Sequence, residues 1–176
     1  MLAVLILAEG LTAFCALGFE IAMARLVAPH AGMSTDTWTA IIAAFLLALA
    51  LGNHIGGRVA AASDLRQRLC VAAGATTPWR IVTFAAAPCL PAGLALGIAT
   101  PLLMTTALAL SRSHAVAGLV YGAGATGSVC GVLCVLWWWL DVLGTRATLL
   151  GIALVAVALG ATIAIVALAR PQAALA

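Results

Sequence analysis

Two acidic residues, Glu9 and Glu20, interrupt the first apolar stretch of the chain and are its best candidates for chemistry. A carboxylate can exchange a proton, bind a cation or hold an ion pair. The two lie eleven residues apart, so on an α-helix they share one face to within about 20° and are separated by about 16 Å along the axis. An acid in hydrocarbon costs about 2.5–3.5 kcal/mol on insertion scales. We therefore predict that both face the interior of a helix bundle.

Glu20 needs a polar partner, and Arg25 is poorly placed to be one because it lies about 140° round the same helix. Arg25 is predicted instead to end the helix by extending its guanidinium group to the lipid headgroups. The candidate partners are polar residues of other apolar stretches: Asn53, His54, Tyr121 and Thr126. We predict that Glu20 fixes the helix arrangement through a buried hydrogen bond or ion pair. A transport site and a contact with a partner subunit are the two alternatives.

The remaining ligand-type side chains, three histidines and five cysteines, form no recognised motif. Of the histidines, His30 and His114 are predicted to lie in loops, so neither suggests a haem or a proton relay inside the membrane. Cys130 and Cys134 lie one helical turn apart but lack a CxxC spacing or a histidine partner. The sequence contains no GxSxG, HExxH or P-loop motif, and helix packing explains the glycines of GAGATG at 122–127. The sequence therefore predicts no metal, no cofactor and no enzyme.

The composition indicates which elements position these residues, because 65% of the chain is hydrophobic and only 7% is charged. Soluble domains are roughly 45–50% apolar and 25% charged. We predict an all-α polytopic helix bundle in the lipid bilayer, with a single transmembrane domain over residues 1–176. The net charge of +3 is too small and too dispersed for nucleic-acid binding. Five stretches are long enough to cross about 30 Å of hydrocarbon: 2–28, 38–61, 81–110, 118–140 and 147–169.

The eight arginines predict the orientation of this bundle, since cytoplasmic loops carry an excess of basic residues. With five spans, the side of the N-terminus holds Arg58, Arg66, Arg68, Arg80 and Arg146, and the other side holds Arg25, Arg112 and Arg170. This bias places the N-terminus in the cytoplasm. The stretch 69–80 is too short for a full span and too apolar for an ordinary loop. A sixth crossing there is the alternative, and it would return the C-terminus to the cytoplasm.

Small residues mark the predicted helix contacts. Four pairs of glycines stand four residues apart: Gly52 and Gly56, Gly93 and Gly97, Gly118 and Gly122, and Gly127 and Gly131. Lipid tails give helices no hydrophobic reason to associate, so close backbone approach through such residues holds a bundle together. We predict a tightly packed bundle. Trp137, Trp138 and Trp139 are predicted to form an aromatic belt at the membrane interface, with at least one indole facing lipid. A docking surface for another membrane protein is the alternative.

Four stretches, taken in order, carry a family resemblance: GFEIAMARLVAPHAG, IIAAFLLALALGNHIGGRVA, LPAGLALGIATPLL and GLVYGAGATGSVCGVLCVLWWWLDVLGTRATLL. They resemble the membrane domain of the bacterial spermidine-synthase-like membrane proteins, which is similar to half of a major facilitator transporter. The resemblance implies the bacterial inner membrane, with GNHIGGRVA at the cytoplasmic end of the second helix. It also implies a third helix before LPAGLALGIATPLL, where this chain is shorter. Family members continue into a soluble aminopropyltransferase-like domain with a Rossmann-type loop, which does not follow here and which is a further reason to expect no enzyme.

We expect a non-catalytic integral membrane subunit or scaffold of a larger membrane complex, because the chain carries more small-residue faces than a bundle of its size needs. The expected docking residues are Gly118, Gly122, Gly127 and Gly131, together with the three tryptophans. The expected partners are other integral membrane subunits, or a second copy of the chain in a homo-oligomer. The alternative is a small transporter-like half-bundle acting as a dimer. It is favoured by the intramembrane acids and by a predicted helix break at Gly97–Pro101.

Overall fold

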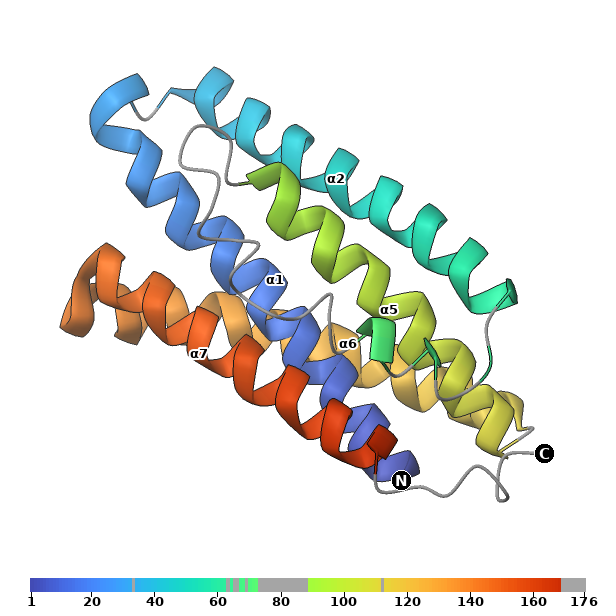
Figure 1. Ribbon diagram of the computed structural model, residues 1–176. Helices are drawn as coiled ribbons and strands as arrows, with labels where there is room; N and C mark the ends of the chain where they lie inside the picture. The colour runs from blue at the N-terminus through green and yellow to red at the C-terminus, as the bar shows by residue number, and fades with distance from the viewer. Residues whose placement is uncertain are drawn as a thin grey trace.

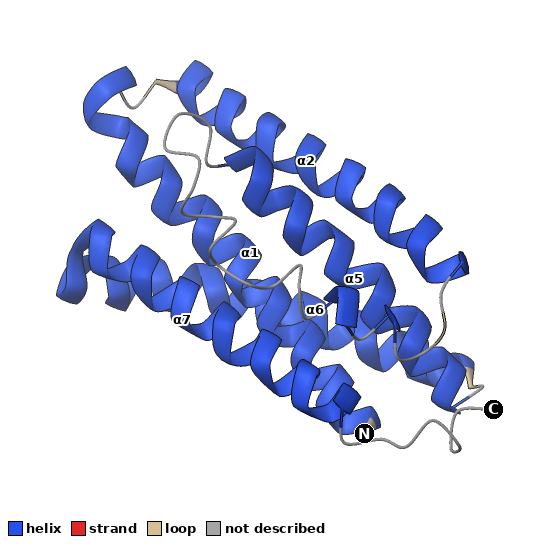
Figure 2. Cartoon of the chain, viewed as in Figure 1, coloured by secondary structure: helices blue, strands red, loops and turns tan. Residues whose placement is uncertain are grey.

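The computed structural model describes residues 1–32, 34–62, 64, 67–68, 70–72, 89–111 and 113–168. Within these ranges the long elements are all helices and no strand occurs, which confirms the all-α prediction (Figures 1 and 2). They are α1 (Leu2–Ala31), α2 (Thr35–Ala62), α5 (Cys89–Ser111), α6 (His114–Cys134), the short π-helix η1 (Val135–Trp139) and α7 (Leu140–Leu168). The predicted stretch 69–80 and the start of the predicted span 81–110 lie largely outside the described residues.

Four helical stretches are long and apolar enough to cross a membrane: Leu2–His30, Thr35–Ala62, Gly93–Ser111 and Ala115–Val166. The last contains 52 residues, about 78 Å of helix at 1.5 Å per residue, which is more than twice the thickness of a hydrocarbon core. Gly144 bends it, because its φ of 75° lies in the left-handed region that glycine adopts without strain. The loop predicted at 141–146 is therefore helical apart from Gly144. Figure 1 shows α6 and α7 running in opposite directions on either side of this bend.

Helix α1 is the centre of the bundle, and it contacts α2, α5, α6, η1 and α7. Its first half packs with α5, α6 and α7 in a cluster that includes Leu5, Leu102 and Ile163. Its second half packs with α2, α5, η1 and α7, where the rings of Phe19 and Phe45 lie 6.3 Å apart. The two clusters account for the burial of α1 along both halves of its length.

Helices α2 and α5 run in the same direction, as successive contacts along them demonstrate. Gly52 of α2 lies against Gly97 of α5, and one turn later Gly56 lies against Ile98 and Pro101. Helix α5 continues through Pro101, so the predicted break at Gly97–Pro101 is absent. Pro101 has no backbone N–H to donate to the Gly97 carbonyl oxygen, and one turn later the Thr105 hydroxyl donates to the Pro101 carbonyl oxygen at 2.8 Å.

The directions of the helices determine where the first and last described helices begin and end. Helix α6 runs parallel to α1, and α7 runs antiparallel to it, so Leu2 and Leu168 lie at the same end of the bundle (Figure 1). The five-span prediction placed the two chain ends on opposite sides, whereas Leu2 and Leu168, the outermost residues of the described helices, lie at one end. Ala62 and Cys89 lie at opposite ends of the bundle, which is the arrangement that the six-crossing alternative requires.

Candidate functional site

Glu9 lies where α1, α5 and α6 meet, and it is the most deeply buried acid that the structure describes, with 5% of its surface exposed. The side chain of Thr100 on α5 hydrogen-bonds to its carboxyl group. From α6, Gly124 faces the same group: a methyl placed on Gly124 would lie 3.5 Å from Glu9 Oε1. The other oxygen, Oε2, has no hydrogen-bond partner among the described residues. The predicted burial of Glu9 is therefore confirmed, and three helices contribute to its surroundings.

Glycines create this junction by letting two backbones touch. A methyl on Gly127 of α6 would overlap the carbonyl oxygen of Gly10, and one on Gly131 would lie 2.5 Å from the carbonyl oxygen of Phe14. Because no Cβ separates the helices there, α6 lies directly on the face of α1 beside Glu9. The carboxyl group is thus enclosed by backbone and a hydroxyl, with no charged side chain among the described residues paired to it.

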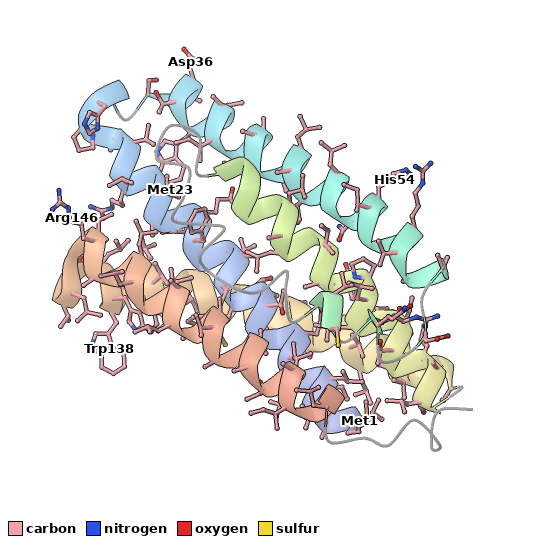
Figure 3. All side chains as sticks on the ribbon, viewed as in Figure 1. Met1, Met23, Asp36, His54, Trp138 and Arg146 are labelled. Atoms are coloured by element: carbon pink, nitrogen blue, oxygen red, sulfur yellow. The ribbon has the colours of Figure 1, made fainter. Side chains whose placement is uncertain are left out.

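Glu20 is also buried, with 8% of its surface exposed, so both acids face the interior as predicted. The residues that the sequence suggested as its partners are placed elsewhere. Asn53 and His54 are exposed on α2, and Figure 3 shows His54 pointing away from the bundle. Tyr121 is 78% exposed. Thr126 is exposed and donates to its own helix, at 3.0 Å from the Gly122 carbonyl oxygen.

Arginines lie at both ends of the bundle. Arg25 is exposed near the end of α1, a position that allows the predicted extension to the headgroups. Arg146 lies beyond the bend, at the end of the bundle opposite Met1 (Figure 3). The five-span prediction put Arg146 on the side of the N-terminus, which is wrong because α6 carries the chain away from that end. Arg66, Arg80, Arg112 and Arg170 lie outside the described residues.

The four glycines of α6 that were predicted to form one docking face lie on two faces. Gly127 and Gly131 are in contact with α1. A methyl on Gly118 or Gly122 would meet nothing within 4 Å. The reason is the helical period: the step of five residues from Gly122 to Gly127 turns the stripe by about 140°. Of these four glycines, Gly118 and Gly122 remain open on the outside of the protein.

The three tryptophans also lie on two faces: two are exposed and one packs inside the bundle. Trp137 and Trp138 are 74% and 66% exposed, which confirms that at least one faces outward. Figure 3 shows Trp138 on the outside of the bundle. Trp139 turns inward, packs edge-on against Phe14 with ring centroids 5.9 Å apart, and covers Gly151. All three lie in the π-helix η1, a local widening of the helix that is often associated with functional positions.

No group of three or more histidine, cysteine and acidic side chains in the described residues is arranged to hold a metal ion. Cys130 is exposed, Cys134 is half-buried and Cys15 is buried beside the Ile152 carbonyl oxygen. His30 and His114 lie in helices, the last turn of α1 and the start of α6, where the sequence predicted loops.

Sequence reasoning missed Thr100, Gly10 and Gly124, which together surround Glu9. Gly10 directly follows Glu9, and Gly124 stands three residues before Gly127, so a search for small residues beside each acid would have found both. Nothing in the sequence pairs Thr100 with Glu9. Comparison with protein family models, with curated proteins and with solved structures finds no match for this chain.

Proposed function

We propose that the protein is a non-catalytic multi-pass membrane subunit or scaffold that binds another integral membrane protein through the outer face of α6. The observation that carries the proposal is the open pair Gly118 and Gly122. Each of the other glycine pairs with this spacing is covered by a neighbouring helix of the same chain: Gly52 and Gly56 by α5, Gly93 and Gly97 by α2, and Gly127 and Gly131 by α1. Small residues are used in membranes for close helix contact, so we infer a helix from outside the chain.

The surroundings of the open pair support a protein neighbour. Tyr121 lies beside it on α6 and is 78% exposed, and its hydroxyl group needs a polar partner that hydrocarbon cannot supply. Trp137 and Trp138 extend the same helix with two large exposed rings. Aromatic residues of this kind are enriched in the buried centres of protein interfaces. The outer face of α6 thus carries two open glycines and an exposed tyrosine, and η1, which follows it, adds two exposed indoles.

Native-gel electrophoresis after mild detergent extraction tests the proposal. We expect the parent protein to migrate with a larger complex and the Gly122→Leu variant to migrate alone with unchanged helicity. Gly57→Leu is the matched control, because Gly57 also has nothing within 4 Å but lies on α2. It should stay in the complex. A parent protein that migrates at the monomer mass with no co-purifying polypeptide would contradict the proposal.

We further propose six crossings in the bacterial inner membrane with the N-terminus in the cytoplasm. The chain has to return from one end of the bundle to the other between Ala62 and Cys89, which is where the spermidine-synthase-like family has its third helix. The positive-inside rule is compatible with this orientation, since Arg58 lies four residues before the end of α2, in the half of that helix nearer the Leu2 end of the bundle. Green fluorescent protein fused behind the last residue should fluoresce, and alkaline phosphatase fused there should be inactive. The reverse result would favour five crossings.

A second candidate function is a transporter-like half-bundle that acts as a dimer. The observation in its favour is the burial of Glu9 and Glu20 along one face of α1, since intramembrane acids often line substrate or ion paths. The continuous course of α5 through Pro101 removes the broken helix that had also favoured it. Uptake into proteoliposomes decides the matter: flux above that of empty liposomes, reduced by Glu20→Gln, would support transport. Background flux in both proteins would eliminate it.

A further inference from the structure

We propose that Glu9 is a proton-binding site inside the membrane domain, a carboxyl group that the junction of α1, α5 and α6 keeps in its protonated form. This proposal does not depend on the docking role of α6. It rests on the burial of the carboxyl group, on its unpartnered oxygen, and on the absence of a charge beside it among the described residues.

The position of Glu9 in the bundle makes an ionised carboxylate costly. It stands seven residues after Leu2, so it lies about 10 Å along α1 from the start of the helix. At that depth the carboxyl group lies beside Thr100 and Gly124, and only 5% of the surface of Glu9 is exposed. A carboxylate in such surroundings is retained only if it is paired or takes up a proton.

The helices packed against Glu9 offer no cation to pair with it. The titratable residues of α5 and α6 are Cys89, His114, Tyr121, Cys130 and Cys134, and those of α7 are Asp141 and Arg146. Of the side chains that the structure describes, Tyr121 and Cys130 are exposed, and no ion pair or hydrogen bond joins any of these residues to the carboxyl group. Asp141 and Arg146 flank the bend at the opposite end of the bundle. Among the residues that the structure describes, none supplies a charge to neutralise the group, and a bound proton would do so.

The number of oxygen atoms distinguishes a proton from a metal ion. Calcium takes six to eight oxygen ligands, and magnesium requires a near-octahedral set. Glu9 and Thr100 together supply three side-chain oxygens, and Gly124 supplies no side chain. Three buried side-chain oxygens in the described residues lack a hydrogen-bond partner, and Glu9 Oε2 is the one that can carry a titrating proton, since the others are the hydroxyls of Thr106 and Thr148.

Glu9 is expected to exchange its proton independently of Glu20. The two acids lie about 16 Å apart along α1, which is too far for direct transfer. Thr12, which is buried in the interval, donates its hydroxyl to the Ala8 carbonyl oxygen at 2.8 Å and is committed to its own helix. The nearest aqueous phase for Glu9 is therefore the one at the Leu2 end of the bundle.

Labelling with the hydrophobic reagent dicyclohexylcarbodiimide tests the site in protein reconstituted into liposomes. A protonated carboxyl group adds across one N=C bond of the carbodiimide, and the adduct rearranges to a stable N-acylurea without a leaving group. Peptide mass spectrometry then measures the labelled fraction of each acid between pH 5 and pH 10 in buffers free of sodium. We expect Glu9 to be labelled at neutral pH, and its labelling to persist to at least tenfold lower proton concentration than that of the exposed Asp141.

Two variants separate a proton site from a merely structural side chain. Glu9→Gln keeps the shape and should abolish the label at position 9, while Glu20→Gln should leave that label intact. Thr100→Val removes the hydroxyl that hydrogen-bonds to the carboxyl group, so the pH dependence of labelling at position 9 should shift while that of Asp141 stays unchanged. Should Glu9→Gln fold poorly, the infrared band of a protonated carboxyl group in the parent protein gives the same information.

Three outcomes would overturn the proposal. Glu9 could remain unlabelled over the whole range, or it could lose its label at the same pH as Asp141. Sodium could also protect Glu9 from the reagent at constant pH, in which case the site binds a metal cation. The docking proposal and the Glu9 proposal can fail separately, because the docking face and Glu9 lie on different sides of α6. Absence of a larger complex on the native gel, with labelling of Glu9 intact, would contradict the docking proposal alone.

Discussion

The contact between α2 and α5 and the outer face of α6 carry the same pattern, a pair of glycines four residues apart, yet they differ in what the glycines meet. In the first region a methyl on Gly56 would lie 2.6 Å from both the Ile98 carbonyl oxygen and Pro101 Cγ, and one on Gly97 would lie 2.5 Å from the Leu49 carbonyl oxygen. In the second, a methyl on Gly118 or Gly122 would meet nothing within 4 Å. The spacing marks a face that can pack closely, and only the neighbouring helix decides whether it does.

Helix α6 contains this contrast within a single element. Gly127 and Gly131 lie on α1, whereas Gly118 and Gly122 face outward. A one-residue departure from the four-residue spacing is enough to move the stripe to the other side of the helix. Substitution of packed glycines and of open glycines tests whether the two kinds differ in their contribution to stability.

Gly127→Leu should have the largest effect, because any side chain there collides with the backbone of Gly10 rather than with a flexible group. We expect a loss of at least about 4 kcal/mol, enough to prevent recovery of monodisperse protein. Gly122→Leu, five residues earlier on the same helix, should melt like the parent when isolated. Size-exclusion profiles and thermal unfolding in detergent make the comparison. Equal behaviour of the two variants would mean that α1 and α6 are not packed through Gly127.

Gly56→Ala and Gly57→Ala are neighbours on α2 that should differ by a smaller amount. The methyl of the first meets Ile98 and Pro101 at 2.6 Å, so α5 has to move, and we expect a cost of about 2–3 kcal/mol. The methyl of the second meets nothing within 4 Å, and its effect should be within about 0.5 kcal/mol. The measurement is the midpoint of unfolding in mixed micelles containing increasing dodecyl sulfate. A lower midpoint for Gly57→Ala than for Gly56→Ala would reverse the assignment of the two faces.

Trp139→Ala and Trp138→Ala extend the comparison to side chains. Trp139 packs edge-on against Phe14 and covers Gly151, so its removal should cost about 2 kcal/mol through lost ring contacts and a partly filled cavity. Trp138 is 66% exposed, and Trp138→Ala should change the stability of the isolated protein by less than about 0.5 kcal/mol. Tryptophan fluorescence provides an independent check. Lipid-borne quenchers, but not water-soluble ones, reduce the emission of indoles that face lipid. Trp138→Ala should remove more of this emission than Trp139→Ala does.

Much of the fold could be predicted from the sequence, because a lipid environment requires helices and directs acidic side chains inward. An apolar chain in lipid has to satisfy its backbone within helices, and acids such as Glu9 and Glu20 are directed inward by the cost of facing hydrocarbon. Both acids are buried as predicted. At Gly52, Gly56, Gly93 and Gly97, a methyl group would meet atoms of the neighbouring helix, α5 or α2.

The direction of the helices could not be predicted, because hydropathy measures length and depth but not the side on which a helix begins. One crossing more or less reverses everything after it, and the structure places Arg146 at the end of the bundle opposite Met1 rather than on the side of the N-terminus. The surroundings of Glu9 were equally hidden, since Thr100 is ninety-one residues away and becomes its neighbour only through the packing of α5 on α1. The partners suggested for Glu20 were chosen for polarity alone, and Asn53 and His54 are exposed on α2.

The smallest effect is expected from the double substitution of Gly118 and Gly122 by alanine. Neither methyl meets an atom within 4 Å, and alanine favours a helix over glycine by up to about 1 kcal/mol per residue, so the isolated protein should be unchanged or slightly more stable. A helix that docks against bare glycines, however, would be pushed outward by two methyl groups. The same variant should therefore leave the larger complex in a native gel while its own unfolding midpoint stays level or rises. Destabilisation of the isolated protein would mean that the outer face of α6 is already covered within the chain.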